Sequence, residues 1–180
     1  MAVLNTENSF IKKEQLKKII ALDYEGAAKE NLDYASKKST YEMETIIGLV
    51  QKYKENDLPL DTMWLDIDYM EKFYDFTISS TNFNNLTSIV TDFHLDGLQV
   101  VPILDTGIPT DPTDKYNQLG RELNTFIMSN YTGDPLINTV WPGKCFFPDF
   151  TNPNSKILWE TGLKELNKVL SYDGIWLDMN

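Results

Sequence analysis

The 180-residue sequence has one cysteine and one histidine. Cys145 alone cannot form an intramolecular disulfide, and together with His94 it supplies too few ligands for a Cys/His zinc site. No run reaches the roughly 18 apolar residues of a membrane-spanning helix. The N-terminal region has no apolar segment of signal-peptide length. We therefore expect neither structural zinc nor a membrane partner, and the localisation stays open.

Basic residues are also scarce. Sixteen lysines and arginines stand against 27 acidic residues, which leaves a formal net charge of −11. Such a surface repels nucleic acids and anionic membranes, so we expect neither as a partner. The 42% hydrophobic and 12% aromatic content is typical of a globular protein. The length suits one compact domain and is shorter than the roughly 250 residues of a complete eight-stranded α/β barrel.

Hydrophobic periodicity predicts an α/β protein in which strands alternate with helices. A helical extension without recognisable chemistry is expected over residues 10–36. Further helices are expected from the capping box at Ser39 to a point before Pro59, over 83–97 with Gly97 as the C-terminal cap, over 118–131, and over 154–170 with Asn152 and Pro153 at its start. Strands are expected over 63–70, 98–104 and 174–179, although Pro102 is unusual in a central strand.

The order strand, helix, strand implies parallel pairing with right-handed crossovers. The gap between the second and the last strand is about twice the usual one. We therefore interpret residues 105–153 as an insertion that contains structure of its own.

Each predicted strand ends on an acid. Asp66 and Asp68 lie near the end of the first strand, Asp105 follows the second, and Asp178 lies near the end of the last. In parallel α/β sheets and barrels the active site lies beyond the carboxyl ends of the strands, so these acids are expected to converge. Burying several carboxylates together opposes their ionisation, which favours a functional reason for their presence. The alternative is that each aspartate only caps the loop or helix that follows it.

Tryptophans accompany the acids. Strand alternation places Trp64 on the same face as Asp66, and Trp176 on the same face as Asp178. Indole rings stack on the apolar faces of sugars, and carboxylates accept hydrogen bonds from sugar hydroxyl groups, so the pattern favours a carbohydrate pocket. Alternatively the aromatic residues belong to the core, or Asp66 and Asp68 hold a divalent metal ion.

Five segments together resemble the family 31 glycoside hydrolases, the α-glucosidase group of lysosomal and intestinal maltases. They are LPLDTMWLDIDYM (58–70), DFT (75–77), VVPILDTGI (100–108), VWPGKCFFPDFTNP (140–153) and DGIWLDMN (173–180). The resemblance implies a partial (β/α)8 TIM barrel over residues 41–180, with an insertion after its third strand. Residues 1–40 show no similarity to the family and are interpreted as an N-terminal helical extension.

The resemblance also implies retaining hydrolysis of terminal α-linked glucose from maltose-like oligosaccharides, without a cofactor. Asp178 matches the catalytic nucleophile. The positions that match the sugar-binding pocket are Asp66, Ile67, Ile103, Asp105, Trp141, Trp176 and Met179.

Retaining hydrolysis needs a second carboxyl group about 5–5.5 Å from the first, as the acid/base. The resemblance assigns that acid to a later strand, so we expect the chain to be a fragment that is inactive alone. The alternatives are a non-catalytic carbohydrate-binding remnant and a metal-dependent glycosyl transferase. The oligomeric state and the linkage specificity stay open.

Overall fold

The computed structural model describes residues 43–178, without the side chain of Glu44. Residues 48–59 belong to one compact unit, and residues 43–47 and 60–178 belong to another. The extension predicted for residues 1–40 lies outside the described residues. Within the part that is described, no helix combines the length and the apolarity needed to cross a membrane.

The helix expected before Pro59 is confirmed as α3 (Met43–Glu55). Asp57 adopts a left-handed backbone conformation with φ 55°. The Leu58 amide then donates to the Tyr53 carbonyl at 2.9 Å, and the Asp57 amide donates to the Lys54 carbonyl at 3.1 Å. These two bonds form a Schellman motif, which satisfies the last carbonyls and ends the helix.

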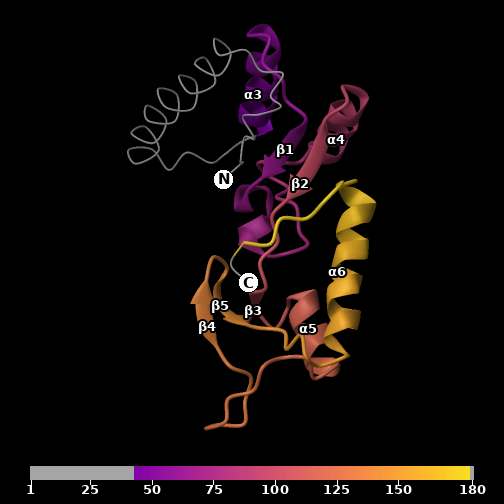
Figure 1. The fold of residues 1–180 in the computed structure, drawn as a ribbon. Helices are drawn as coiled ribbons and strands as arrows, with labels where there is room; N and C mark the ends of the chain where they lie inside the picture. Colours follow the sequence, from indigo (N-terminus) through magenta and orange to yellow (C-terminus); the bar gives the residue numbers. More distant parts are fainter. Residues whose placement is uncertain (1–42, 179–180) are drawn as a thin grey trace, which may run out of the picture. The chain divides into compact units, whose positions relative to one another are not determined.

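The predicted parallel pairing is confirmed for the first two strands (Figure 1). β1 (Thr62–Leu65) pairs with β2 (Gln99–Pro102), with Thr62 opposite Gln99 and Leu65 opposite Pro102. α4 (Leu86–Leu95) connects them, and Gly97 with φ 82° ends it as predicted. The right-handedness of this crossover stays a prediction.

The first strand is shorter than predicted. It ends at Leu65, and the 3-10 helices η2 (Ile67–Tyr69) and η3 (Glu71–Phe73) follow. The alternation expected through residue 70 is therefore wrong beyond Leu65, because the Asp66 side chain caps η2. Asp68 does not share a strand face with Trp64.

The last predicted strand is reduced to a parallel bridge between Ile103 and Trp176. The Trp176 amide donates to the Pro102 carbonyl at 3.0 Å, and the Leu104 amide donates to the Trp176 carbonyl at 2.9 Å. Figure 1 shows this C-terminal segment, in yellow, running beside β2. Pro102 has no N–H, which removes a donor from the edge that faces the segment.

The helix predicted over 118–131 is displaced towards the N-terminus, as α5 (Lys115–Glu122). Asn124 adopts a left-handed conformation with φ 53°, and the Thr125 amide donates to the Gly120 carbonyl at 3.0 Å. The chain then turns back, and Phe126 forms an antiparallel bridge with Pro148. The predicted helix is therefore wrong beyond residue 122.

Residues 105–153 have structure of their own, as expected. β3 (Ile108–Pro109), β4 (Asn138–Val140) and β5 (Gly143–Phe146) form an antiparallel sheet in the order β3-β5-β4. Gly143, with φ 99°, lies at the turn between β4 and β5. That this stretch is an insertion into a barrel stays a proposal.

The helix predicted over 154–170 is confirmed as α6 (Ser155–Val169). Its N-cap is Asn154 rather than Asn152. Asn152 instead accepts the Asn154 amide at 3.0 Å in the preceding turn. α6 contributes Leu158 and Leu166 to the core, both without exposed surface.

Phe76 is a packing centre for α5 and α6. Its ring centroid lies 4.8 Å from that of Tyr116 and 5.1 Å from that of Trp159. A Cβ atom added to Gly162 of α6 would lie 2.6 Å from the Phe76 ring. Only glycine therefore allows α6 to approach this ring so closely.

We expect Gly162→Ala to destabilise the protein by about 1–3 kcal/mol, because the buried Phe76 ring must move. Gly48→Ala is the matched control, since Gly48 also lies within a helix but its Cβ would meet nothing within 4 Å. That substitution should stabilise the protein by roughly 0.5–1 kcal/mol. Urea unfolding measures both, and equal effects would show that Phe76 does not restrict this position.

Candidate active site

Strand register places the predicted acids at one edge of the parallel arrangement. Leu65, the last residue of β1, accepts the Ile103 amide at 2.9 Å, and Asp66 follows it directly. Asp105 lies two residues after Ile103, and Asp178 lies two residues after Trp176, the bridge partner of Ile103. All three acids thus follow the carboxyl ends of neighbouring parallel segments.

Asp66 has a local structural role. Its side chain is exposed, and Oδ1 accepts the Ile67 amide at 2.7 Å as the N-cap of η2. Asp66 therefore does cap η2, through Oδ1 alone, and its predicted part in sugar binding stays a prediction. Partial burial, with Asp66 nearby as the second cause, raises the pKa of Asp68.

Asp105 is buried beside a second acid, Asp75, that we did not predict as a site residue. Asp105 is 7% exposed and Asp75 is 3% exposed. The Asp105 amide donates to Asp75 Oδ1 at 3.0 Å. Asp75 Oδ2 is buried and has no hydrogen-bond partner among the described residues. Burial raises the pKa of Asp75 well above its usual range, and the Asp105 charge adds to this.

Tyr69 connects the segment after β1 to the end of β2. The side chain is 1% exposed, and its hydroxyl donates to the Ile103 carbonyl at 2.8 Å. Burial raises the pKa of Tyr69 well above its usual range, so the phenol remains a hydrogen-bond donor at neutral pH. This bond holds Ile103, which the resemblance places in the sugar pocket.

The structure brings together two of the predicted indole rings. Trp64 and Trp176 meet edge to face, with ring centroids 5.9 Å apart and planes at 80°. Trp64 is 56% exposed, so a large apolar surface remains open for stacking. Trp141 is also exposed, but it lies in the turn after β4, on the antiparallel sheet. Ile67 is half-buried in η2.

Asp178 is exposed, at the end of the described residues. Met179 lies outside the described residues, so its predicted role stays a proposal.

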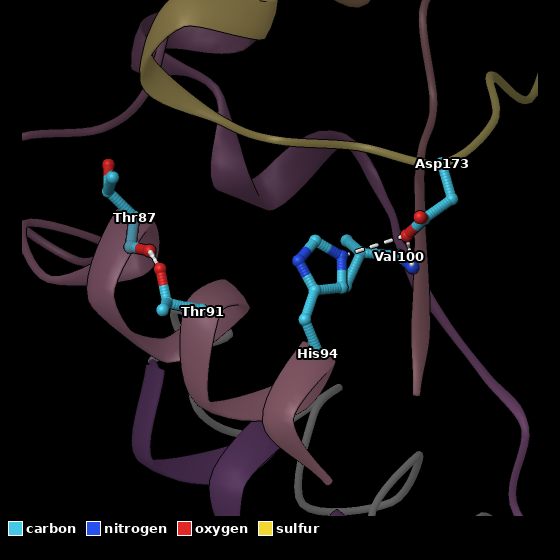
Figure 2. Close-up of polar contacts among 5 residues, drawn as sticks. All are labelled: Thr87, Thr91, His94, Val100 and Asp173. Atoms are coloured by element: carbon cyan, nitrogen blue, oxygen red, sulfur yellow. Dashed lines mark hydrogen bonds and ion pairs between the residues drawn. The ribbon is translucent and has the colours of Figure 1, made fainter. Parts of the chain in front are cut away.

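Asp173 lies three residues before Trp176. Like Asp75, it is an acid that we did not predict as a site residue. Figure 2 shows the His94 ring and the Val100 amide both pointing to its carboxylate. The Val100 amide, and secondarily His94, lowers the pKa of Asp173 below its usual range. For both Asp75 and Asp173, the only sequence signal was their place inside segments that match the family, DFT and DGIWLDMN.

The metal alternative gains no support from the geometry. Within residues 43–178, no group of three or more His, Cys, Asp or Glu side chains is arranged to hold a metal ion.

Residues 28–180 match the family model described as the glycosyl hydrolases family 31 TIM-barrel domain. The chain belongs to glycosyl hydrolase family 31. This confirms the resemblance found in the sequence. The match begins inside the predicted extension, and the boundary at residue 40 stays a prediction.

Relatives of this family 31 chain include the lysosomal acid alpha-glucosidase of Tetrahymena pyriformis, which is 39% identical over 145 residues. The intestinal sucrase-isomaltase of Homo sapiens is 34% identical over 156 residues. These matches cover 78% and 83% of the chain, but 15% and 8% of the relatives. The chain therefore spans a small part of the length of the curated relatives it matches.

The solved structures agree on the fold. The family 31 alpha-glucosidase from Bacteroides thetaiotaomicron superposes with a TM-score of 0.64 at 29% sequence identity. That match covers 74% of this chain and 22% of the bacterial one. The predicted α/β barrel fold is therefore confirmed, whereas the extent of the barrel within this family 31 chain stays a proposal.

Proposed function

We propose that this chain supplies the nucleophile and part of the sugar pocket of a retaining α-glucosidase. Its substrate would be the terminal α-linked glucose of maltose-like oligosaccharides. The observation that carries the proposal is the strand register, in which Asp66, Asp105 and Asp178 follow three neighbouring parallel segments. The names of the relatives, which are α-glucosidases, support the same substrate class.

Asp178 is proposed as the nucleophile. Its carboxylate attacks the anomeric carbon, the glycosidic C–O bond breaks, and an ester between Asp178 and glucose forms. Water later attacks the same carbon and releases the carboxylate. Asp66 and Asp105 accept sugar hydroxyl groups, and such charged acceptors form stronger hydrogen bonds than neutral ones.

The indole pair forms the apolar part of the proposed pocket. Trp64 and Trp176, each two residues before an acid of the proposed site, meet edge to face. Trp141, Ile67, Ile103 and Met179 complete the sugar-binding residues of the proposal. We further propose that residues 41–180 form a partial (β/α)8 barrel in which residues 105–153 are an insertion.

We expect the 180-residue polypeptide not to hydrolyse maltose by itself. Protonation of the glycosidic oxygen requires an acid about 5–5.5 Å from the nucleophile, and the resemblance assigns that acid to a later barrel strand. A substrate whose leaving group needs no proton therefore tests the nucleophile directly.

The test uses 5-fluoro-α-glucosyl fluoride, which releases fluoride as the Asp178 ester forms. We expect mass spectrometry to find one fluoroglucosyl group on the peptide that contains Asp178, and none in Asp178→Asn. Labelling of another acid would overturn the assignment. Calorimetric binding of glucose without any labelling would favour the alternative, a non-catalytic carbohydrate-binding remnant.

A further inference from the structure

The segment that leads to Trp176 and Asp178 is attached to β2 in an irregular way. The Asp173 amide donates to the Val100 carbonyl at 2.9 Å, and the Trp176 amide donates to the Pro102 carbonyl at 3.0 Å. In a regular parallel ladder, successive donors on one strand are two residues apart. Here they are three residues apart, so the pairing slips by one residue between Asp173 and Trp176.

A side chain replaces the backbone bond that this slip removes. The Val100 amide donates to Asp173 Oδ2 at 2.7 Å instead of to a carbonyl group. Pro102, the next residue of β2 that faces the segment, has no amide hydrogen. The Asp173 carboxylate is therefore the acceptor that holds the start of the segment against β2.

The same carboxylate oxygen also contacts α4. His94 Nε2 lies 2.9 Å from Asp173 Oδ2, and Figure 2 shows the ring and the Val100 amide meeting there. An ionised carboxylate can only accept hydrogen bonds, so His94 Nε2 carries the hydrogen and donates it to Asp173 Oδ2. His94 lies in the last turn of α4 and thus connects the C-terminal segment to the helix that joins β1 and β2.

We propose that Asp173 and His94 are positioning residues that set the register of residues 174–178 against β2. This inference rests on the proposed function, because that function makes Asp178 the nucleophile and Trp176 a sugar-binding residue. Few other bonds fix this register, since the described backbone hydrogen bonds beyond Gly174 are those of Trp176 with Pro102 and Leu104. Without the two bonds of the Asp173 side chain, only these few backbone bonds oppose a shift of the segment by one residue, which would reverse the faces of Trp176 and Asp178.

The contact between His94 and Asp173 lies partly at the surface. The side chains of His94 and Asp173 are 31% and 35% exposed, and a polar contact with that exposure contributes little to the free energy of unfolding by itself. The bond to the Val100 amide is charge-assisted, however, and it occupies a donor that would otherwise lack its ladder partner. The expected effect is therefore on placement of the segment more than on global stability.

The test compares variants by the circular dichroism band that the contacting indoles of Trp64 and Trp176 produce. Trp176→Phe identifies this band. We expect Asp173→Ala and His94→Leu to weaken it, and His94→Gln to restore most of it, because glutamine keeps a donor. In nuclear magnetic resonance exchange measurements, the Leu104 amide should lose protection about tenfold or more in Asp173→Ala.

Thr87→Val is the matched control. Thr87 also lies on α4, and its hydroxyl donates to the Val169 carbonyl at the end of α6 at 2.6 Å. This variant loses a hydrogen bond between α4 and the C-terminal part of the chain, but none to residues 173–178. It should leave the indole band and the Leu104 amide unchanged.

The rate at which 5-fluoro-α-glucosyl fluoride labels Asp178 provides the functional measurement. A small misplacement of a reacting group costs a large factor in rate, so we expect labelling to slow by at least about tenfold in Asp173→Ala. An unchanged indole band and unchanged Leu104 protection in Asp173→Ala would overturn the inference. If the unmodified chain is not labelled, the proposed function fails, while the band and the amide still decide the role of Asp173.

Discussion

Replacing Asp75 with asparagine is expected to stabilise the protein at pH 8 and to change its stability little at pH 4. Asp75 is 3% exposed, and its Oδ2 atom lacks a hydrogen-bond partner among the described residues. An unsatisfied buried polar atom costs about 1–3 kcal/mol, and more when it is charged. Asparagine keeps an oxygen for the Asp105 amide and removes the possibility of a charge.

The pH dependence follows from the direction of the pKa shift. Burial raises the pKa of Asp75 in the folded protein, so the folded state binds more protons than the unfolded state above the unfolded pKa of about 3.9. Stability due to this group therefore falls as the pH rises from about 4 towards the folded pKa, and then stays constant. Asp75→Asn lacks this loss, so its advantage should increase from pH 4 upwards.

Urea unfolding at several pH values measures this difference, since the titrating groups that do not interact with Asp75 contribute equally to both proteins. We expect a gain of at least about 1 kcal/mol at pH 8. Asp75→Leu is the control: it removes the acceptor of the Asp105 amide, and it should destabilise the protein at both pH values. A loss of stability in Asp75→Asn that is equal at pH 4 and pH 8 would contradict the account.

Replacing Asp105 with asparagine is expected to weaken sugar binding by roughly 5- to 10-fold. Under the proposed function, the buried Asp105 carboxylate accepts a sugar hydroxyl group. Hydrogen bonds to charged groups contribute about 1.5–3 kcal/mol and neutral ones about 0.5–1.5 kcal/mol, so the exchange costs about 1–1.5 kcal/mol. Calorimetric titration with acarbose measures the affinity.

Asp61→Asn is the matched control for Asp105→Asn. Asp61 is exposed and directly precedes β1, at the amino end of the strand, whereas Asp66 and the proposed pocket lie at the carboxyl end. Its replacement removes the same charge but should leave the affinity unchanged. If both variants bind acarbose equally well, Asp105 does not accept a sugar hydroxyl and the pocket assignment is wrong.

Local sequence patterns predicted the helices wherever the residues that end them were recognised. Gly97 marked the end of α4 because glycine readily adopts a positive φ, and the structure confirms this. Asn124 ends α5 in the same way, but the apolar residues after it, Phe126 and Ile127, continued the helical spacing and concealed the signal. Phe126 instead turns back on α5, where a Cβ added to Gly120 would lie 2.3 Å from its ring.

The site could be predicted only in part for a related reason. Acids at strand ends are visible in a sequence, and the parallel register then places Asp66, Asp105 and Asp178 at one edge. The buried partner of Asp105 could not be predicted, because Asp75 is 30 residues away and its importance arises from burial. Asp173 and His94 are 79 residues apart and meet only through the pairing of β2 with the C-terminal segment.

The amino-acid sequence alone determined the family, the alternation of strands and helices, and the indoles near the strand ends with the acids that follow them. These features depend on residue type and on short spacing, which the chain carries in any conformation. Only the tertiary structure decided which carboxylates are buried, which are exposed, and from which amides they accept hydrogen bonds. Desolvation and hydrogen bonding depend on neighbours that the fold brings together from distant positions, as with Asp75 and Asp105 or Asp173 and His94.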